Sequence, residues 1–188
     1  MFRRLFGVSV LAGLLCATTA SAGLLPVNVS VNKEGDTYRW TYAIVLPTDS
    51  QLRSGDYFTI YDFGGYVPDS TVAPADWTVQ AAKLGPVTPG LNPQDDPTIT
   101  NLTFLYGGPT INSGQTGLGN FWALSEYSLG TDSFFTARTH RTSDGRIDAN
   151  ITETTVPVPT APPGVPEPAT LALAGIGLPL VAALRRRK

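Results

Sequence analysis

The 188-residue sequence contains one cysteine, one histidine and one methionine. Cys16 lies in an N-terminal apolar stretch that we expect to be removed, so the remaining chain has no disulfide and no thiol for catalysis or metal binding. Zinc and copper sites are disfavoured because these metals prefer histidine and cysteine, and only His140 remains. A serine nucleophile needs an adjacent base, and no Gly-x-Ser-x-Gly motif accompanies this histidine. We therefore expect no catalytic site, and a polar strand face exposed to water is the simpler setting for His140.

Basic residues are scarce between the two ends of the chain. Six of the thirteen lysines and arginines lie in the terminal segments, and between Gly23 and Gly164 seven basic residues face fourteen acidic ones, a net charge of −7. A domain with this balance repels phosphate backbones, so nucleic acid is excluded as an expected partner.

The central region also lacks a helical period of useful length. Residues 37–46 alternate with a period of two and place Trp40, Tyr42, Ile44 and Leu46 on one face. Glycine and proline fall mainly between such segments. We predict an all-β fold, a two-layer antiparallel β-sandwich of jelly-roll or Ig-like type. The eight expected strands are a first run containing Val27, Val29 and Val31, then residues 37–46, 57–63, 77–82, 98–106, 120–128, 133–141 and 146–155.

The N-terminal segment has the layout of a secretory signal peptide. Arg3 and Arg4 precede an apolar stretch that ends at Ala20-Ser21-Ala22, an A-x-A cleavage site with Ala20 and Ala22 as its small residues. We predict that residues 1–22 are removed, with the export machinery and signal peptidase as partners. A twin-arginine signal and a lipoprotein signal at Cys16 are alternatives, but Leu15 is too large for lipoprotein processing.

The last 24 residues read as a second targeting segment. Val165-Pro166-Glu167-Pro168 precedes an apolar run, residues 169–184, and a basic end, residues 185–188. Sixteen residues of helix span about 24 Å, slightly less than the ~30 Å hydrocarbon core, so we predict a single, marginal transmembrane helix. The basic end holds the C-terminus in the cytoplasm and leaves the domain outside.

This arrangement resembles the PEP-CTERM sorting signal of bacterial exported proteins. The resemblance is limited to residues 165–188, together with the N-terminal signal peptide. It implies a membrane peptidase of exosortase type that recognises Pro166, Glu167 and Pro168 and removes the helix. The family pattern also ends in a basic cluster, here Arg185, Arg186 and Arg187, followed by Lys188. An ordinary single-span tail anchor is the alternative.

A proline-rich segment connects the body to this tail. Residues 156–164 contain four prolines, which favour an extended, semi-rigid stalk. The predicted organisation is therefore a signal peptide over residues 1–22, a sandwich domain over 23–155, a stalk over 156–164 and the sorting signal over 165–188.

Two long loops, residues 64–76 and 84–97, are the expected positions of a binding site, because such loops cluster at the ends of a sandwich. Tyr66 and Trp77 are the candidate glycan contacts, since sugars stack on exposed aromatic rings. Core packing is the ordinary role of aromatic residues at strand spacing.

The carboxylates are numerous enough for glycoside hydrolysis to remain an alternative function. Glu126 is the best single candidate for a catalytic carboxylate because it lies in an aromatic-rich strand segment. We expect no cofactor. Calcium is the one metal whose oxygen ligands are available, at Asp95-Asp96 or around Asp144 and Asp148, although no EF-hand spacing occurs.

The sequence thus predicts a non-enzymatic, exported protein with a structural or adhesive role. Its precursor would be anchored in the inner membrane with the domain outside the cytoplasm, and the product would reach the cell surface or an exopolysaccharide matrix. The alternatives are a carbohydrate-binding module acting on that exopolysaccharide, and a secreted polysaccharide hydrolase.

Overall fold

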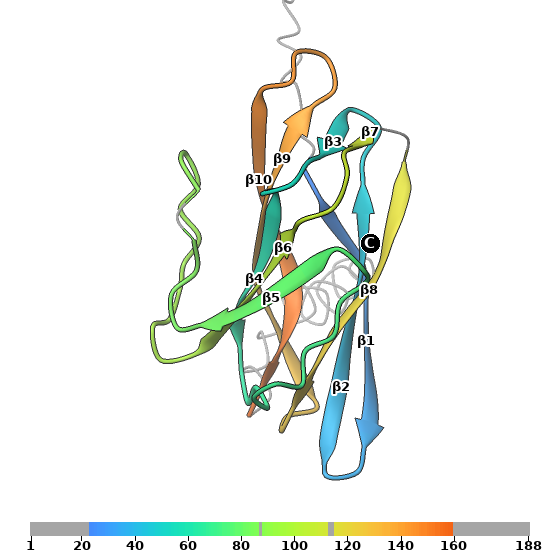
Figure 1. The fold of residues 1–188 in the computed structure, drawn as a ribbon. Helices are drawn as coiled ribbons and strands as arrows, with labels where there is room; N and C mark the ends of the chain where they lie inside the picture. Colours follow the sequence, from blue (N-terminus) through green and yellow to red (C-terminus); the bar gives the residue numbers. More distant parts are fainter. Residues whose placement is uncertain (1–22, 87, 113–114, 160–188) are drawn as a thin grey trace, which may run out of the picture.

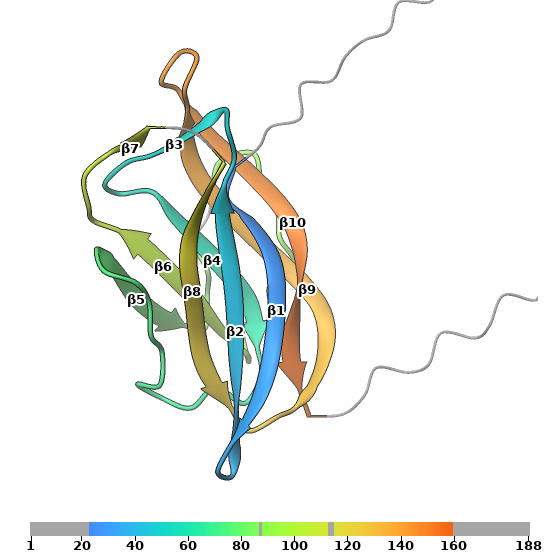
Figure 2. The same ribbon diagram turned by 90° about the vertical axis from the view of Figure 1, so that its right-hand side faces the viewer.

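Ten β-strands form two facing antiparallel sheets in the computed structural model, which describes residues 23–86, 88–112 and 115–159 (Figures 1 and 2). The smaller sheet has the order β1-β2-β8. The larger sheet has the order β5-β6-β4-β9-β3-β7, with β10 on the other side of β9. The strands are β1 (Leu25–Glu34), β2 (Thr37–Leu46), β3 (Ser50–Leu52), β4 (Tyr57–Phe63), β5 (Trp77–Ala82), β6 (Thr100–Tyr106), β7 (Ile111–Asn112), β8 (Thr116–Ser125), β9 (Leu129–Arg141) and β10 (Ile147–Val158). The predicted all-β sandwich is confirmed.

The alternation of β2 explains how the smaller sheet faces the core. Trp40, Tyr42, Ile44 and Leu46 are each at most 1% exposed, while the residues between them are half-buried. The pattern on β1 is interrupted, because a register shift between Pro26 and Asn28 leaves Val27 exposed. The expected alternation, which placed Val27 and Val29 on one face, is therefore broken by a β-bulge, and Val29 packs against the core.

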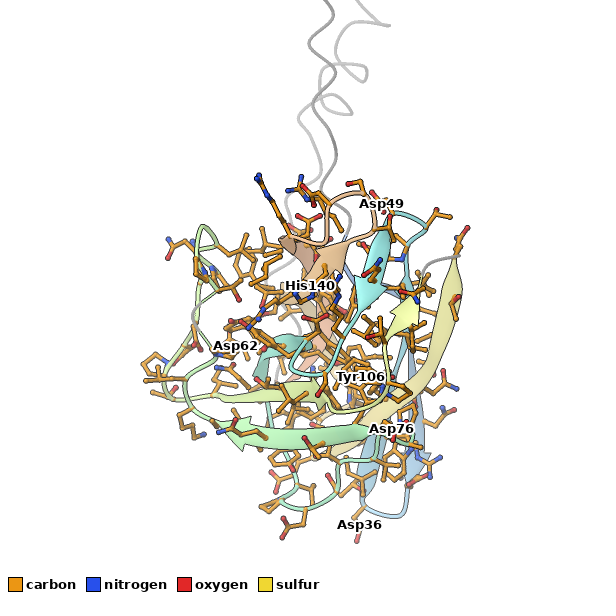
Figure 3. The ribbon with its side chains drawn as sticks, turned by 45° about the horizontal axis from the view of Figure 1, so that its top comes forward. Asp36, Asp49, Asp62, Asp76, Tyr106 and His140 are labelled. Atoms are coloured by element: carbon orange, nitrogen blue, oxygen red, sulfur yellow. The ribbon has the colours of Figure 1, made fainter. Side chains whose placement is uncertain are left out.

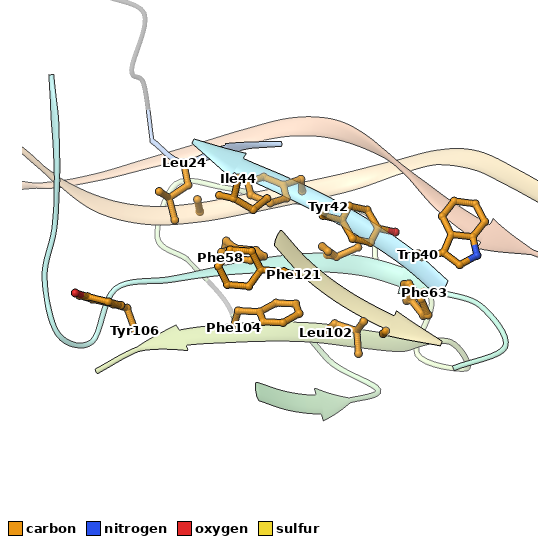
Figure 4. Close-up of a cluster of buried hydrophobic side chains, with 14 of the residues drawn as sticks. Leu24, Trp40, Tyr42, Ile44, Phe58, Phe63, Leu102, Phe104, Tyr106 and Phe121 are labelled. Carbon is orange, nitrogen blue, oxygen red and sulfur yellow. The ribbon is translucent and has the colours of Figure 1, made fainter. Parts of the chain in front are cut away.

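Aromatic rings fill the space between the sheets (Figure 4). Phe58 of β4 lies at their centre. Its ring centroid lies 4.8 Å from that of Phe104, 4.9 Å from that of Phe121 and 5.3 Å from that of Phe135. Two of these contacts are stacked and one is edge-on, arrangements worth about 0.5–1.5 kcal/mol each beyond area burial. This core accounts for an exported domain that has no disulfide.

The last strand continues beyond the expected end of the domain. β10 pairs with β9 through Val158, the Val156 side chain is 1% exposed, and the Pro157 carbonyl accepts a hydrogen bond from the Gly64 N–H at 3.1 Å. The first three residues of the predicted stalk are thus part of the sheet. Proline is tolerated there because, within the described chain, β10 pairs only with β9. The edge of β10 that faces away from β9 therefore needs no N–H from Pro157.

Several predicted segments lie outside the described residues. These are the signal peptide, the Pro-Glu-Pro motif, the transmembrane helix over residues 169–184 and the basic end. Among residues 23–159, gaps excepted, no helix is long and apolar enough to cross a membrane.

Candidate functional site

The loop between β5 and β6 packs against the outer face of the larger sheet, beside β9 and β10 (Figure 1). Two tyrosines of β4 hold it there. The Tyr57 hydroxyl lies 2.7 Å from the Thr88 hydroxyl, and the Tyr61 hydroxyl donates to the Pro86 carbonyl at 3.2 Å. Burial raises the pKa of Tyr61, which keeps this phenol protonated and able to donate. A β-carbon on Gly85 would lie 2.4 Å from the Tyr61 ring, so only glycine lets the loop approach so closely.

A cavity of about 580 Å³ lies between this loop and the sheet. Its floor crosses three strands, because Tyr57 pairs with Arg138 and Arg138 pairs with Ala149 in the sheet register. Ile147 of β10 and loop residues 88–91 form the remaining walls. The volume falls within the ~300–1,000 Å³ of typical ligand pockets.

Arg138 supplies the positive charge of the cavity. Its guanidinium carbon lies 6.0 Å from the centroid of the Tyr57 ring, a cation–π arrangement. Its Nε is buried without a hydrogen-bond partner, and none of the salt bridges between described residues includes Arg138. The guanidinium therefore retains hydrogen-bond donors for a ligand.

A buried carboxylate–imidazole contact lies at the neighbouring end of β4 and β9. Asp56 Oδ2 lies 3.1 Å from His140 Nδ1 and accepts the Arg53 N–H at 2.8 Å, while its Oδ1 is buried without a partner in the described chain. Burial raises the pKa of Asp56; the Arg53 N–H, His140 and the charge of Arg138 act in the opposite direction. Figure 3 shows His140 beside β3, far from Asp36 at the other end of the sandwich.

This pairing alters the expected setting of His140. The residue does share the outer face of β9 with Arg138, but its side chain is only 14% exposed and contacts a fully buried carboxylate. A plain water-exposed strand face is therefore the wrong description. The two residues are 84 positions apart, so no local sequence signal could pair them.

The two candidate glycan contacts lie near opposite ends of β5. Tyr66 lines two cavities, of about 310 and 370 Å³, together with Lys83 and Thr100 just beyond the end of that strand. Trp77 begins the strand and packs into the aromatic core, 5.5 Å from Phe58 and 5.0 Å from Phe121 between ring centroids. The structure does not bring Tyr66 and Trp77 into one site.

The hydrolase candidate Glu126 follows the end of β8 and is exposed. Its backbone N–H binds the Gly65 carbonyl at 2.9 Å, which fixes the turn after the strand. The expected strand over residues 120–128 is therefore wrong at its end, and Glu126 does not lie inside it.

The candidate calcium ligands hold the local structure together. Asp95 accepts hydrogen bonds from the Gly85 N–H and the Asn101 amide, and Asp96 accepts two from Thr98. Asp144 forms ion pairs with Arg141 and Arg146. In the part of the chain that the structure describes, no three histidine, cysteine or acidic side chains are grouped to hold a metal ion.

Sequence reasoning missed Tyr57, Arg138 and Asp56 as site residues. One signal was available in the sequence. Residues 57–63 are mostly aromatic or apolar, whereas a strand with only one buried face needs such residues at every second position. Such a run is typical of a strand covered on both faces. β4 is covered by the core on one side and by the loop on the other.

Comparison with known proteins identifies the C-terminal segment. The family model of the PEP-CTERM protein-sorting motif matches residues 164–188, which confirms the resemblance seen in the sequence. No curated protein and no solved structure matches the chain. The motif implies export, a membrane-anchored precursor and processing by an exosortase.

Proposed function

We propose that this chain, an exported protein carrying a PEP-CTERM sorting motif, is a structural or adhesive component of the cell surface or of an exopolysaccharide matrix. The motif at residues 164–188 is the observation that carries the proposal. The domain that precedes it has an aromatic and aliphatic core and no disulfide, and its net charge of −7 favours solubility outside the cell.

The distance between domain and motif supports a release step. The last described residue, Pro159, is six residues from Val165, a separation of at most about 20 Å for a fully extended chain. Before processing, the domain is therefore tethered close to the membrane surface. Removal of the tail after Pro-Glu-Pro would free it without cutting β10, which ends at Val158.

Replacing the motif in the native host tests this proposal. Glu167→Ala with Pro166→Ala should leave the domain in the membrane fraction, whereas the wild type should appear at the surface or in the extracellular matrix. Glu153→Ala, an exposed substitution on β10, is the matched control and should be sorted like the wild type. Release of the double variant to the same extent would contradict the proposal.

Carbohydrate binding is the second candidate function, supported by the two cavities that share Tyr66 and Lys83. Tyr66→Ala should reduce retention on immobilised exopolysaccharide. Tyr66→Phe should retain the ring and lose only the 2.8 Å hydrogen bond to Thr71. Equal retention of wild type and Tyr66→Ala would remove this candidate.

A further inference from the structure

Arg138 differs from the other arginines of the domain in what surrounds its charge. Arg39 pairs with Glu34, Arg141 and Arg146 pair with Asp144, and the Arg53 guanidinium donates to Gln51. Arg138 has no such partner among the described residues. The nearby Asp56 carboxylate is already in contact with His140 and the Arg53 N–H.

The surroundings of this guanidinium suit one anionic group on a compact ring. A guanidinium binds a carboxylate through two parallel N–H···O bonds, which fixes the orientation of the ligand. The ring of Tyr57 and the side chains of Ile147 and Leu91 line the cavity around it. Ile147 is 56% exposed, so it leaves apolar surface available to the non-polar face of a bound ring.

Charge limits the ligand further. Arg138 is the one charged side chain among the described residues that line the cavity, and the domain has a net charge of −7. A densely charged polyphosphate would therefore be repelled, while a single carboxylate per ring would be neutralised.

We propose that the cavity under the β5–β6 loop binds a carboxylate-bearing sugar residue, a hexuronate of an acidic polysaccharide, with Arg138 pairing to the carboxylate and Tyr57 and Ile147 contacting the ring. The choice of a polysaccharide rests on the proposed location outside the cell. The site itself is independent of sorting, so failure to bind would leave the processing of the tail untouched, and failure of processing would leave binding measurable.

Titration calorimetry of the exported protein with hexuronate oligosaccharides tests the assignment. Neutral hexose oligosaccharides of equal length and inorganic phosphate are the comparison ligands. The wild type should bind the uronate, with binding that weakens as salt rises, and should bind the other two at least tenfold more weakly. Equal binding of neutral oligosaccharides, equal binding of phosphate, or no uronate binding at millimolar concentration would each overturn the proposal.

Variants locate the binding energy. Arg138→Gln should weaken uronate binding at least tenfold, because it removes the charge-assisted hydrogen bonds to the carboxylate. Arg138→Lys keeps the positive charge but cannot form the two parallel N–H···O bonds, so it should bind with intermediate affinity. This variant also tests the proposal if the Arg138→Gln protein folds poorly. Arg146→Gln, whose side chain is 78% exposed and does not line the cavity, should stay within twofold of wild type. Unchanged binding by a folded Arg138→Gln or Arg138→Lys protein would refute the assignment.

Discussion

A protein that ends after Thr155 should be much less stable than one that ends after Pro159, although the two differ by only four residues. The shorter protein loses the Val156 side chain, which is 1% exposed in the core. Full burial of a valine contributes about 1.5–3 kcal/mol. It also loses the Pro157 carbonyl that accepts the Gly64 N–H, and the pairing of residues 156–158 with β9.

Together these losses amount to about 4 kcal/mol, taking ~2 for Val156 and ~1 each for the Gly64 bond and for the remaining ladder bonds. Domains of this kind have a total stability of only ~5–15 kcal/mol. With a urea dependence of about 2 kcal/mol per molar, the unfolding midpoint should fall by about 2 M.

Urea unfolding of the two proteins, both starting at Gly23 and followed by fluorescence, measures this difference. Val156→Ala in the longer protein isolates the core contribution and should cost about 2 kcal/mol. Val158→Ala, at a half-buried position two pairs further along the ladder, should cost less than about 1 kcal/mol. Coincident unfolding curves for the two chain lengths would refute the view that residues 156–158 belong to the fold.

Three further predictions follow from the core, the loop and the buried Asp56 carboxyl group. Phe58→Ala should cost about 3–5 kcal/mol in thermal unfolding, whereas Leu105→Ala, 44% exposed, should cost ~0.5 kcal/mol or less; similar losses would contradict the central position of Phe58. Tyr57→Phe removes the 2.7 Å bond to Thr88 and should speed proteolysis within the β5–β6 loop at a global cost of about 1 kcal/mol; an unchanged cleavage rate would argue against the tether. Burial raises the folded-state pKa of Asp56, so its contribution to stability is fully present below the unfolded-state pKa and is lost as pH rises through the folded-state pKa. Urea midpoints between pH 4 and 7 should therefore vary less for Asp56→Asn than for wild type, and parallel pH profiles would exclude this linkage.

The strands that could be predicted are those whose side chains alternate over many residues. β2 shows this directly, since Trp40, Tyr42, Ile44 and Leu46 are all buried as expected. β3 and β7 were missed because three and two residues are too few for a periodic signal. Pro157 gave a misleading end to β10, because proline usually stops a strand but is accepted here, where no described residue needs its N–H as a donor.

The candidate site was less predictable than the fold because its parts are distant in the sequence. The pairing of β4 with β9 places Tyr57 beside Arg138, 81 residues later in the chain, and the register between strands so distant is not encoded locally. The tail was predictable for the opposite reason. Pro166, Glu167 and Pro168 and the basic end are recognised as a linear motif, which needs no fold to bring its residues together.

Intact mass spectrometry of the protein recovered from its native cell envelope tests the central claim most directly. Sorting by an exosortase predicts a chain that begins at Gly23 and ends near Pro166–Pro168, with the whole of β10 retained. A protein that still carries Arg185, Arg186, Arg187 and Lys188 would contradict processing and leave an ordinary membrane anchor in its place.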